Sequence, residues 1–327
     1  MSDSYRMVRW GILGCARIAE ECTLPAMLCA YNAIPFAIAG RNPDRVRYFK
    51  ERFGFERAYG DYTSLLDDPD VEAVYVPLPN NLHKDWVIKA LERGKAVLCE
   101  KPIAMTPDEL QEIMDASVKY ERPVMEAFAF RQSIAVKKIN EIIASGAIGE
   151  LKTIVTRISF MLSKPDDFRL EKDMGGGSLY DIGSYNVNFI NMIMKTPPKR
   201  IYAVSGMHEE KNVDMDCDCI FIYDNGVKAL SHCAMNTPEY NDYAITGTAG
   251  TIDFPYDPNA YGDLRLTVSN ESGETVYKFK VQNVYQSEIE QFSRVVSEGE
   301  KQELSLEESM ENLETITRIL SLLEKQE

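Results

Sequence analysis

The sequence of 327 residues has few of the features that mark membrane, secreted or nucleic-acid-binding proteins. No stretch approaches 18 uninterrupted apolar residues, and the N-terminus has no apolar core of a signal peptide, so we expect neither a membrane span nor a secretory leader. Basic residues number 36 against 51 acidic ones, a formal charge of −15. This charge disfavours phosphate backbones and anionic membranes, so no nucleic-acid or membrane partner is expected.

Histidine and cysteine are also sparse, which limits metal chemistry. The chain has three histidines and seven cysteines, and the cysteines are odd in number and scattered. This usage predicts a reducing compartment, the cytoplasm, rather than a disulfide framework. Cys217 and Cys219 form the one close pair, and alternate residues of a strand share a face. Buried thiols are therefore favoured over a metal site there, and no metal is expected.

The remaining composition is that of an ordinary globular protein, with 45% hydrophobic and 27% charged residues. Its length suits two domains, each able to bury its own core.

In residues 1–126, short apolar runs alternate with helical patterns. This alternation predicts a doubly wound parallel sheet of the Rossmann type, and the fingerprint turn described below makes it a candidate dinucleotide-binding domain. The expected strands are residues 8–13, 34–39, 71–76, 97–100 and 123–128, and the expected helices are residues 44–54, 84–94 and 106–120, with a short helix within 61–66.

Residues 127–327 have a different pattern, which predicts an α+β domain. Long alternating runs indicate a large, mostly antiparallel sheet with helices on one face, and Asp224-Asn225-Gly226 is a strong hairpin signal. Ser305 and Glu308 form a capping box for the second of two C-terminal helices. The expected strands are residues 151–163, 200–207, 215–223, 227–235, 264–268 and 276–281, and the expected helices include 136–145 and 187–194.

Lys101 is the first candidate for chemistry. The apolar run from Val97 ends abruptly in Glu100, Lys101 and Pro102, a pattern typical of a buried parallel strand that delivers charge into a ligand crevice. Proline restricts the backbone of the residue before it and can take a cis bond, so it would hold Lys101 where the strand aims it. The alternative is a surface turn with a solvated Glu-Lys pair.

The first strand runs directly into a degenerate dinucleotide fingerprint, Gly14-Cys15-Ala16-Arg17-Ile18-Ala19. Small residues in such a turn let the backbone approach a pyrophosphate at a helix N-terminus. At the end of the second strand stands Gly40-Arg41 in place of the acidic residue that usually contacts the ribose of NAD. An arginine there can pair with a 2′-phosphate, so NADP is the preferred cofactor and NAD the alternative.

A second polar motif lies in Gly175–Tyr185, ahead of the apolar helix. If that segment were regularly helical, Asp181, Tyr185 and Asn188 would share one face. A tyrosine with an ordinary pKa of about 10 is a poor base, but a nearby ammonium such as that of Lys101 would favour its phenolate. The alternative is a partly solvated helix face.

Four segments together resemble one enzyme family. WGILGCARIA, the EKP turn at Glu100–Pro102, the EAF triplet at Glu126–Phe128 and GGGSLYDIGSY are similar to the glucose-fructose oxidoreductase, inositol dehydrogenase and rhizopine-catabolism (Gfo/Idh/MocA) family over essentially the whole chain. The tyrosine form of the last motif is similar to dihydrodiol and D-xylose dehydrogenases. Tyr185 in place of the histidine of many members makes an inositol dehydrogenase less favoured.

The resemblance implies roles for individual residues. It implies that Lys101 contacts the reacting hydroxyl and the cofactor, that Tyr185 gives or takes the proton, and that Asp181 orients its partners or contacts substrate. It also implies that the loop with Pro79, Asn80 and His83 lies beside the nicotinamide. The expected cofactor-binding residues are Gly14, Cys15, Ala16, Arg17, Ile18, Gly40, Arg41, Pro79, Asn80, His83, Glu100 and Lys101, and the expected substrate-binding residues are Lys101, Phe168, Arg169, Asp181 and Tyr185.

These patterns lead to the hypothesis of an NAD(P)-dependent oxidoreductase acting on a CH–OH or C=O carbon of a sugar or cyclic polyol. Two alternatives stay open: a dinucleotide-binding sensor without turnover, and a ketoreductase of a nucleotide-linked sugar. The resemblance also implies that residues 127–327 form a domain for substrate binding and oligomerisation, with a homodimer or homotetramer formed through the C-terminal sheet.

Overall fold

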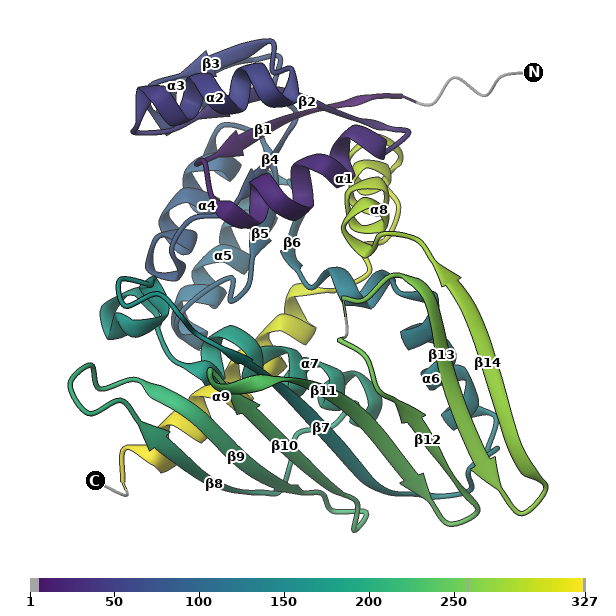
Figure 1. The fold of residues 1–327 in the computed structure, drawn as a ribbon. Coiled ribbons are helices and arrows are strands. Elements are labelled where there is room, and N and C mark those ends of the chain that lie inside the picture. The colour runs from purple at the N-terminus through teal and green to yellow at the C-terminus, as the bar shows by residue number, and fades with distance from the viewer. Residues whose placement is uncertain (1–5, 258, 326–327) are drawn as a thin grey trace, which may run out of the picture. The chain divides into compact units, whose positions relative to one another are not determined.

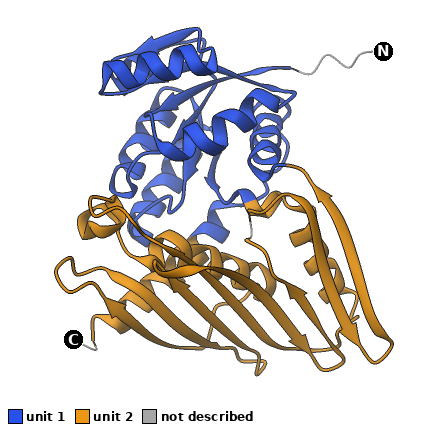
Figure 2. Cartoon of the chain, in the orientation of Figure 1, with its two compact units in different colours: residues 1–129, 283–309 blue, residues 130–282, 310–327 orange. Residues whose placement is uncertain are grey.

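The computed structural model describes residues 6–257 and 259–325, and these form two compact units (Figure 1). The first unit holds residues 1–129 and 283–309, and the second holds 130–282 and 310–327 (Figure 2). No helix of the described segments is long and apolar enough to cross a membrane.

The first unit is built on a six-stranded parallel sheet of order β3-β2-β1-β4-β5-β6. This order is that of a doubly wound dinucleotide-binding fold, so the predicted fold is confirmed. Strand β4 and most of β5, inside the sheet, are apolar and buried because helices cover both sides of the sheet. The strands are β1 (Val8–Leu13), β2 (Ala33–Ala39), β3 (Arg57–Tyr59), β4 (Ala73–Val76), β5 (Ala96–Glu100) and β6 (Val124–Ala127). The helices are η1 (Ala19–Thr23), α1 (Leu24–Cys29), α2 (Pro43–Phe53), α3 (Tyr62–Leu66), η2 (Asn80–Leu82), α4 (His83–Glu92) and α5 (Pro107–Tyr120).

Helix α8 (Val284–Glu298) belongs to the first unit although it follows the whole second sheet in the chain. The ring of Phe292 lies 5.8 Å from that of Trp10 in β1, and Trp10 Nε1 donates to Ser293 Oγ at 3.1 Å. Asn32 Nδ2 also donates to the carbonyl of Glu290 at 2.9 Å. The sequence-based division had assigned every residue from 127 onward to the second domain, because no local pattern shows that a segment returns.

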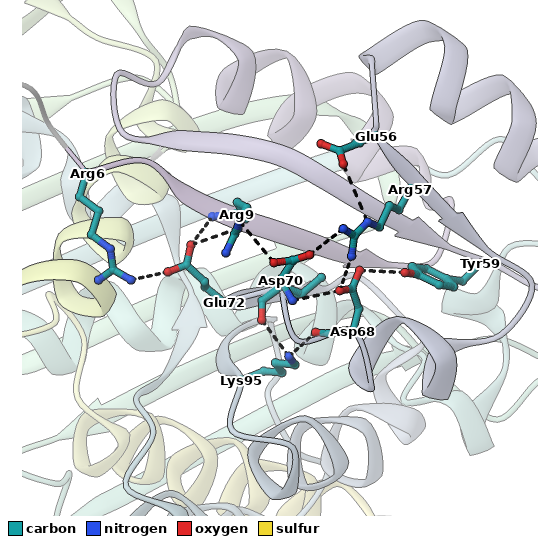
Figure 3. Close-up of polar contacts among 10 residues, drawn as sticks. Arg6, Arg9, Glu56, Arg57, Tyr59, Asp68, Asp70, Glu72 and Lys95 are labelled. Carbon is teal, nitrogen blue, oxygen red and sulfur yellow. Dashed lines mark hydrogen bonds and ion pairs between the residues drawn. The ribbon is translucent and has the colours of Figure 1, made fainter.

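Charged residues join the amino ends of the parallel strands in one network (Figure 3). Arg57 of β3 pairs with Asp68 and with Asp70, at 2.6 Å each, and Tyr59 donates to Asp68 at 2.8 Å. Buried Lys95 donates to the carbonyls of Asp68 and Val71 at 2.6 and 2.8 Å. Burial opposes the charge on Asp68, but the Asp70 amide, Tyr59 and Arg57 outweigh it and hold the pKa below its ordinary value. This edge of the sheet is therefore tied together by polar contacts, and the opposite edge carries the candidate site.

The second unit contains an eight-stranded sheet of order β14-β13-β12-β11-β7-β10-β9-β8. Only the β10–β7 pair is parallel among its described pairings, so the predicted mostly antiparallel sheet is confirmed. The predicted hairpin at Asn225-Gly226 joins β9 to β10, and Gly226 has a φ of 83° that favours glycine. The strands are β7 (Leu151–Met161), β8 (Arg200–Met207), β9 (Asp214–Ile222), β10 (Lys228–Ala234), β11 (Asn236–Gly247), β12 (Gly250–Phe254), β13 (Gly262–Asn270) and β14 (Gly273–Val281).

Helices lie on one face of this sheet, as expected from the sequence. Helix α6 packs on β13 and β14, and α7 packs on β7 and β10 (Figure 1). The other face is open and carries exposed apolar side chains from three neighbouring strands: Tyr202, Val204, Ile220 and Leu230. The helices are η3 (Ala129–Gln132), α6 (Ile134–Ala144), η4 (Phe168–Leu170), η5 (Lys172–Met174), η6 (Leu179–Gly183), α7 (Ser184–Met194) and α9 (Leu306–Leu323), of which the second unit takes the part of α9 from residue 310.

Candidate active site

The turn after β1 has the close backbone geometry that a dinucleotide needs. Gly14 has a φ of 112°, and its amide donates to the carbonyl of Ala39 at 2.8 Å. A Cβ on this glycine would lie 3.1 Å from Leu78 Cδ2, so a side chain would strain the backbone and crowd the loop after β4. Cys15 and Ala16 follow, and η1 is a π-helix, a form that is frequent at functional sites.

A cavity of about 450 Å³ opens beside this turn, lined by Cys15, Gly40, Arg41, Asn42, Arg45 and Tyr62. Asn42 caps α2 by accepting from the amides of Asp44 and Arg45 at 3.0 and 3.2 Å. This cap sets the first turn of α2 and so directs Arg45 toward the fingerprint turn. Arg45 Nη2 donates to Glu20 Oε2 at 2.8 Å and to the carbonyl of Cys15 at 3.3 Å.

Three residues that line the cavity were not predicted from the sequence: Asn42, Arg45 and Tyr62. Burial raises the pKa of Tyr62, and the Arg41 charge beside it opposes that rise. The pair Arg41 and Arg45 gives the cavity two guanidinium groups, a donor set suited to a phosphate. The signal for Arg45 was its position in the first turn of a helix capped by Asn42, four residues after Arg41.

Lys101 lies directly after β5, at the carboxyl edge of the parallel sheet. The bond to Pro102 is cis. Glu100, at the end of β5, accepts a hydrogen bond from the Tyr75 hydroxyl, which in turn accepts from Thr23 Oγ1 at 3.0 Å. Gly14 and Lys101 thus occupy the same edge of the sheet, as the sequence predicts.

His83 holds the Lys101 turn to the neighbouring loop. Its Nδ1 lies 2.7 Å from the Pro102 carbonyl and its Nε2 lies 2.7 Å from the Leu78 carbonyl. The imidazole is 0% exposed, and burial lowers its pKa although both carbonyls favour the charged ring. His83 therefore positions this loop in the structure, and its role in cofactor binding stays a prediction. Pro79 is half-buried and Asn80 is buried in the same loop.

In the second unit, the carboxylate of Asp214 lies against the triple glycine and the residues that follow it, a contact that was not predicted from the sequence. Asp214 Oδ2, at the start of β9, accepts from Ser178 Oγ at 2.6 Å and from the Leu179 amide at 2.7 Å. A Cβ on Gly177, whose φ is 110°, would lie 2.1 Å from Asp214 Oδ1. Burial raises the pKa of Asp214, and these donors oppose the rise. Asp214 therefore anchors the amino end of the segment that carries Asp181 and Tyr185.

Asp181 and Arg169 are brought together. Arg169 Nε and Nη2 donate to the two carboxylate oxygens of Asp181 at 2.5 and 3.3 Å, and Nη1 donates to Asp167 at 3.1 Å. Burial disfavours the guanidinium charge, but the two carboxylates outweigh it and raise the pKa of Arg169. The ring of Phe168 lies 4.8 Å from the same guanidinium. Three of the expected substrate-binding residues thus form one cluster.

Tyr185 lies at the start of α7 and is half-buried, with its ring 6.0 Å from that of Phe130. The segment Leu179–Gly183 is a π-helix rather than the regular α-helix assumed from the sequence. Asn188 is buried, and its Oδ1 accepts from Arg131 at 3.4 Å. Asn188 is thus bound by Arg131 of η3.

Cys217 and Cys219 are buried, as the sequence predicts. Both are free thiols, with their sulfur atoms 3.6 Å apart. Within the described ranges, no group of three or more His, Cys, Asp or Glu side chains is placed to hold a metal ion.

Comparison with known proteins identifies the family. Residues 8–128 match the model described as an oxidoreductase family with an NAD-binding Rossmann fold, and residues 136–253 match the GFO/IDH/MocA C-terminal domain. The chain belongs to the Gfo/Idh/MocA oxidoreductase family. The resemblance stated from the sequence motifs is confirmed, and the chain is an NAD(P)-dependent dehydrogenase or reductase.

The chain is similar to several characterised proteins over three quarters or more of its length. It is 34% identical over 315 residues to D-xylose 1-dehydrogenase (NADP(+)) 2 of Haloferax volcanii, covering 95% of each chain. It is 31% identical to trans-1,2-dihydrobenzene-1,2-diol dehydrogenase of Xenopus tropicalis, covering 76% of each. A 3-ketoreductase from Actinomadura kijaniata, solved with NADP and TDP-benzene, superposes with a TM-score of 0.91 at 26% identity over 97% of this chain and 98% of that one.

Proposed function

We propose that this oxidoreductase moves hydride between NADP(H) and a CH–OH or C=O carbon of a sugar or cyclic polyol, with Lys101 and Tyr185 as its catalytic pair. The observation that carries the proposal is the position of Lys101. It follows β5 on the sheet edge that also holds the Gly14 turn, where doubly wound folds bind their ligands. Residues 1–126 would bind the dinucleotide and residues 127–327 the substrate.

The residues present fit a phosphorylated dinucleotide. Gly14 leaves room for a pyrophosphate, and Arg41 and Arg45 would hold the 2′-phosphate in their cavity. Cys15, Ala16, Arg17 and Ile18 would line the fingerprint turn, and Pro79, Asn80 and Glu100 would lie beside the nicotinamide. The bound nicotinamide supplies the hydride donor or acceptor. NAD is the second cofactor, used less well because it has no 2′-phosphate for the two arginines.

The chain's own residues would manage the proton and the charge. Tyr185 would give or take the proton of the substrate hydroxyl at its phenolic oxygen. The Lys101 ammonium would stabilise negative charge on the substrate oxygen as the C–H bond of the substrate breaks. Asp181, fixed by Arg169, would accept a hydrogen bond from a substrate hydroxyl, and Phe168 would contact the ring of the substrate.

The substrate class rests on the relatives. One is named a D-xylose dehydrogenase and another a dihydrodiol dehydrogenase, so both act on carbinol carbons of small ring or sugar molecules. A second candidate is a ketoreductase of a nucleotide-linked sugar. It is favoured by the close fold match to the 3-ketoreductase solved with TDP-benzene.

A substrate screen tests this proposal. Absorbance at 340 nm is followed with NADP or NAD and a panel of aldoses, inositols and cyclic diols, and with NADPH or NADH and the matching keto sugars and TDP-linked keto sugars. We expect turnover with one group of free sugars or diols, faster with the phosphorylated cofactor. Turnover confined to the TDP-linked compounds would select the second candidate. Tight NADPH binding without turnover on any compound would favour a sensor instead.

We also propose a homodimer or homotetramer formed through the open face of the second sheet. Tyr202, Val204, Ile220 and Leu230 are exposed there, and such an apolar face marks an interface. Val204→Glu should lower the mass measured by light scattering to that of one chain; an unchanged mass would contradict this interface. All seven cysteines are free thiols, which supports a place in the reducing cytoplasm.

A further inference from the structure

Glu126 is a buried carboxylate beside the Lys101 turn, and the proposed chemistry gives it no role. It is the third residue of β6, lies opposite Cys99 of β5 in the parallel register, and is 3% exposed. Burying an ionised carboxylate is unfavourable unless hydrogen bonds or an opposite charge compensate. The groups around Glu126 therefore indicate what it does.

The carboxylate holds the backbone just beyond Lys101. Glu126 Oε1 accepts from the amide of Ile103 at 3.0 Å. On the other side of this turn, the Pro102 carbonyl meets the His83 ring at 2.7 Å. The turn is thus fixed by two buried side chains from different elements, β6 and α4. Glu126 Oε2 is buried and forms no hydrogen bond within the described part of the chain.

The groups around Glu126 bring the pKa of its carboxyl close to neutral pH. Burial is the largest effect and raises its pKa to about 7, whereas the Ser309 hydroxyl, the Ile103 amide and the Lys101 ammonium favour the charged form. Glu100 opposes that form, and the buried Cys99 thiol faces the carboxylate from β5. The proton on Glu126 therefore exchanges within the pH range in which enzymes are assayed.

We propose that Glu126 is a positioning residue for Lys101: its carboxylate holds the turn through Ile103 and attracts the ammonium, so Lys101 is directed at the substrate while Glu126 is ionised. This inference rests on the proposed catalytic role of Lys101. Glu126 acts through the turn and the ammonium rather than on the substrate, because almost none of it is exposed. Protonation below about pH 7 removes the attraction and weakens the bond to Ile103, so turnover should fall on the acid side.

The test is the pH dependence of kcat/KM, at saturating NADPH and with the substrate that the screen identifies, in wild-type enzyme, Glu126→Gln and Glu51→Gln. Glu51 is exposed on α2 and serves as the matched control. Wild type and E51Q should lose activity below about pH 7. E126Q should be flat across that range and about tenfold slower than wild type at about pH 8, with KM for NADPH unchanged within about twofold.

A second variant keeps the test decisive if E126Q does not fold. Glu126→Asp keeps the carboxyl but shortens its reach to the Ile103 amide, so the acid limb should remain while kcat/KM falls across the whole pH range. An acid limb in E126Q with the wild-type midpoint, or full wild-type activity in E126D, would overturn the proposal.

Lys101→Ala separates this inference from the proposed function. Full turnover in K101A would show that the proposed function itself is wrong. Loss of turnover in K101A together with a wild-type pH profile in E126Q would reject the role of Glu126 alone.

Discussion

Arg45 and Arg41 show what can and cannot be predicted at the scale of single residues. Arg41 follows a strand end, where an established rule for dinucleotide folds applies, and the sequence predicts its role. No such positional rule applies to Arg45. Its role depends on the Asn42 cap that sets the turn of α2 and on Glu20 that holds its guanidinium, and these partners lie up to 25 residues away.

Removing Arg45 should reduce the selectivity for NADP. A charge-assisted hydrogen bond contributes about 2 kcal/mol, so Arg45→Ala should raise KM for NADP by about 30-fold while KM for NAD changes little. Arg41→Ala should act in the same direction. Arg47→Ala is the control, because Arg47 is exposed on the same helix and does not line the cavity. Steady-state kinetics with both cofactors measure this; equal losses with NADP and NAD would mean that the arginines do not contact the 2′-phosphate.

Lys101 and Tyr185 were selected from local pattern, because Lys101 follows an apolar run and Tyr185 precedes an apolar helix, and their catalytic roles stay predictions. The burial of His83, in contrast, was not predictable from its neighbours in the sequence. A histidine in a polar loop suggests a ligand contact, but its ring is fully buried between two carbonyls, which no local pattern reveals.

At the scale of elements, the boundaries of long periodic segments were predictable. The strand expected at 8–13 and the one expected at 200–207 agree with β1 and β8, and the capping box is present, since Ser305 N donates to Glu308 Oε2 at 3.1 Å and Glu308 N to Ser305 Oγ at 3.2 Å. Strand β11 was missed because Pro238 and an irregular register between Asn236 and Tyr240 interrupt its alternation. The short strands β3 and β12 were also not predicted, because so few residues do not show a clear alternation of apolar and polar side chains.

The segment before α7 shows the limit of helical periodicity. The sequence places Asp181 and Tyr185 on one face of a regular helix, but Leu179–Gly183 forms a π-helix anchored by Asp214 from β9. The triple glycine signals an unusual backbone, yet the carboxylate that requires Gly177 lies 37 residues later in the sequence.

Gly177→Ala should therefore destabilise the second unit strongly. Its φ of 110° disfavours a side chain, and the new Cβ would lie 2.1 Å from Asp214 Oδ1. The two effects together should lower the free energy of unfolding by about 2–5 kcal/mol. Gly226→Ala is the matched control: its φ is 83° but nothing lies within 4 Å of the new Cβ, so it should lose only about 1–2 kcal/mol. Chemical denaturation measures both, and equal losses would show that the Asp214 contact is unimportant.

At the scale of the whole molecule, composition and alternation were enough for the fold class of each unit, and four sequence motifs were enough for the family. They could not show that residues 283–309 return to the first unit, because the contacts of Trp10 with Ser293 and Phe292 join residues more than 280 positions apart. Nor could they show the polar network at the amino ends of the parallel strands, whose members come from four separate segments (Figure 3).

The central claim is that Lys101 supplies chemistry rather than cofactor affinity. The measurement that tests it is turnover of Lys101→Ala at 340 nm beside a fluorescence titration of the same protein with NADPH. Lys50→Ala, an exposed lysine on α2, is the control. We predict that K101A loses turnover by at least about a hundredfold while its Kd for NADPH stays within about threefold of wild type, and that K50A changes neither. Turnover of K101A at the wild-type rate would contradict the account.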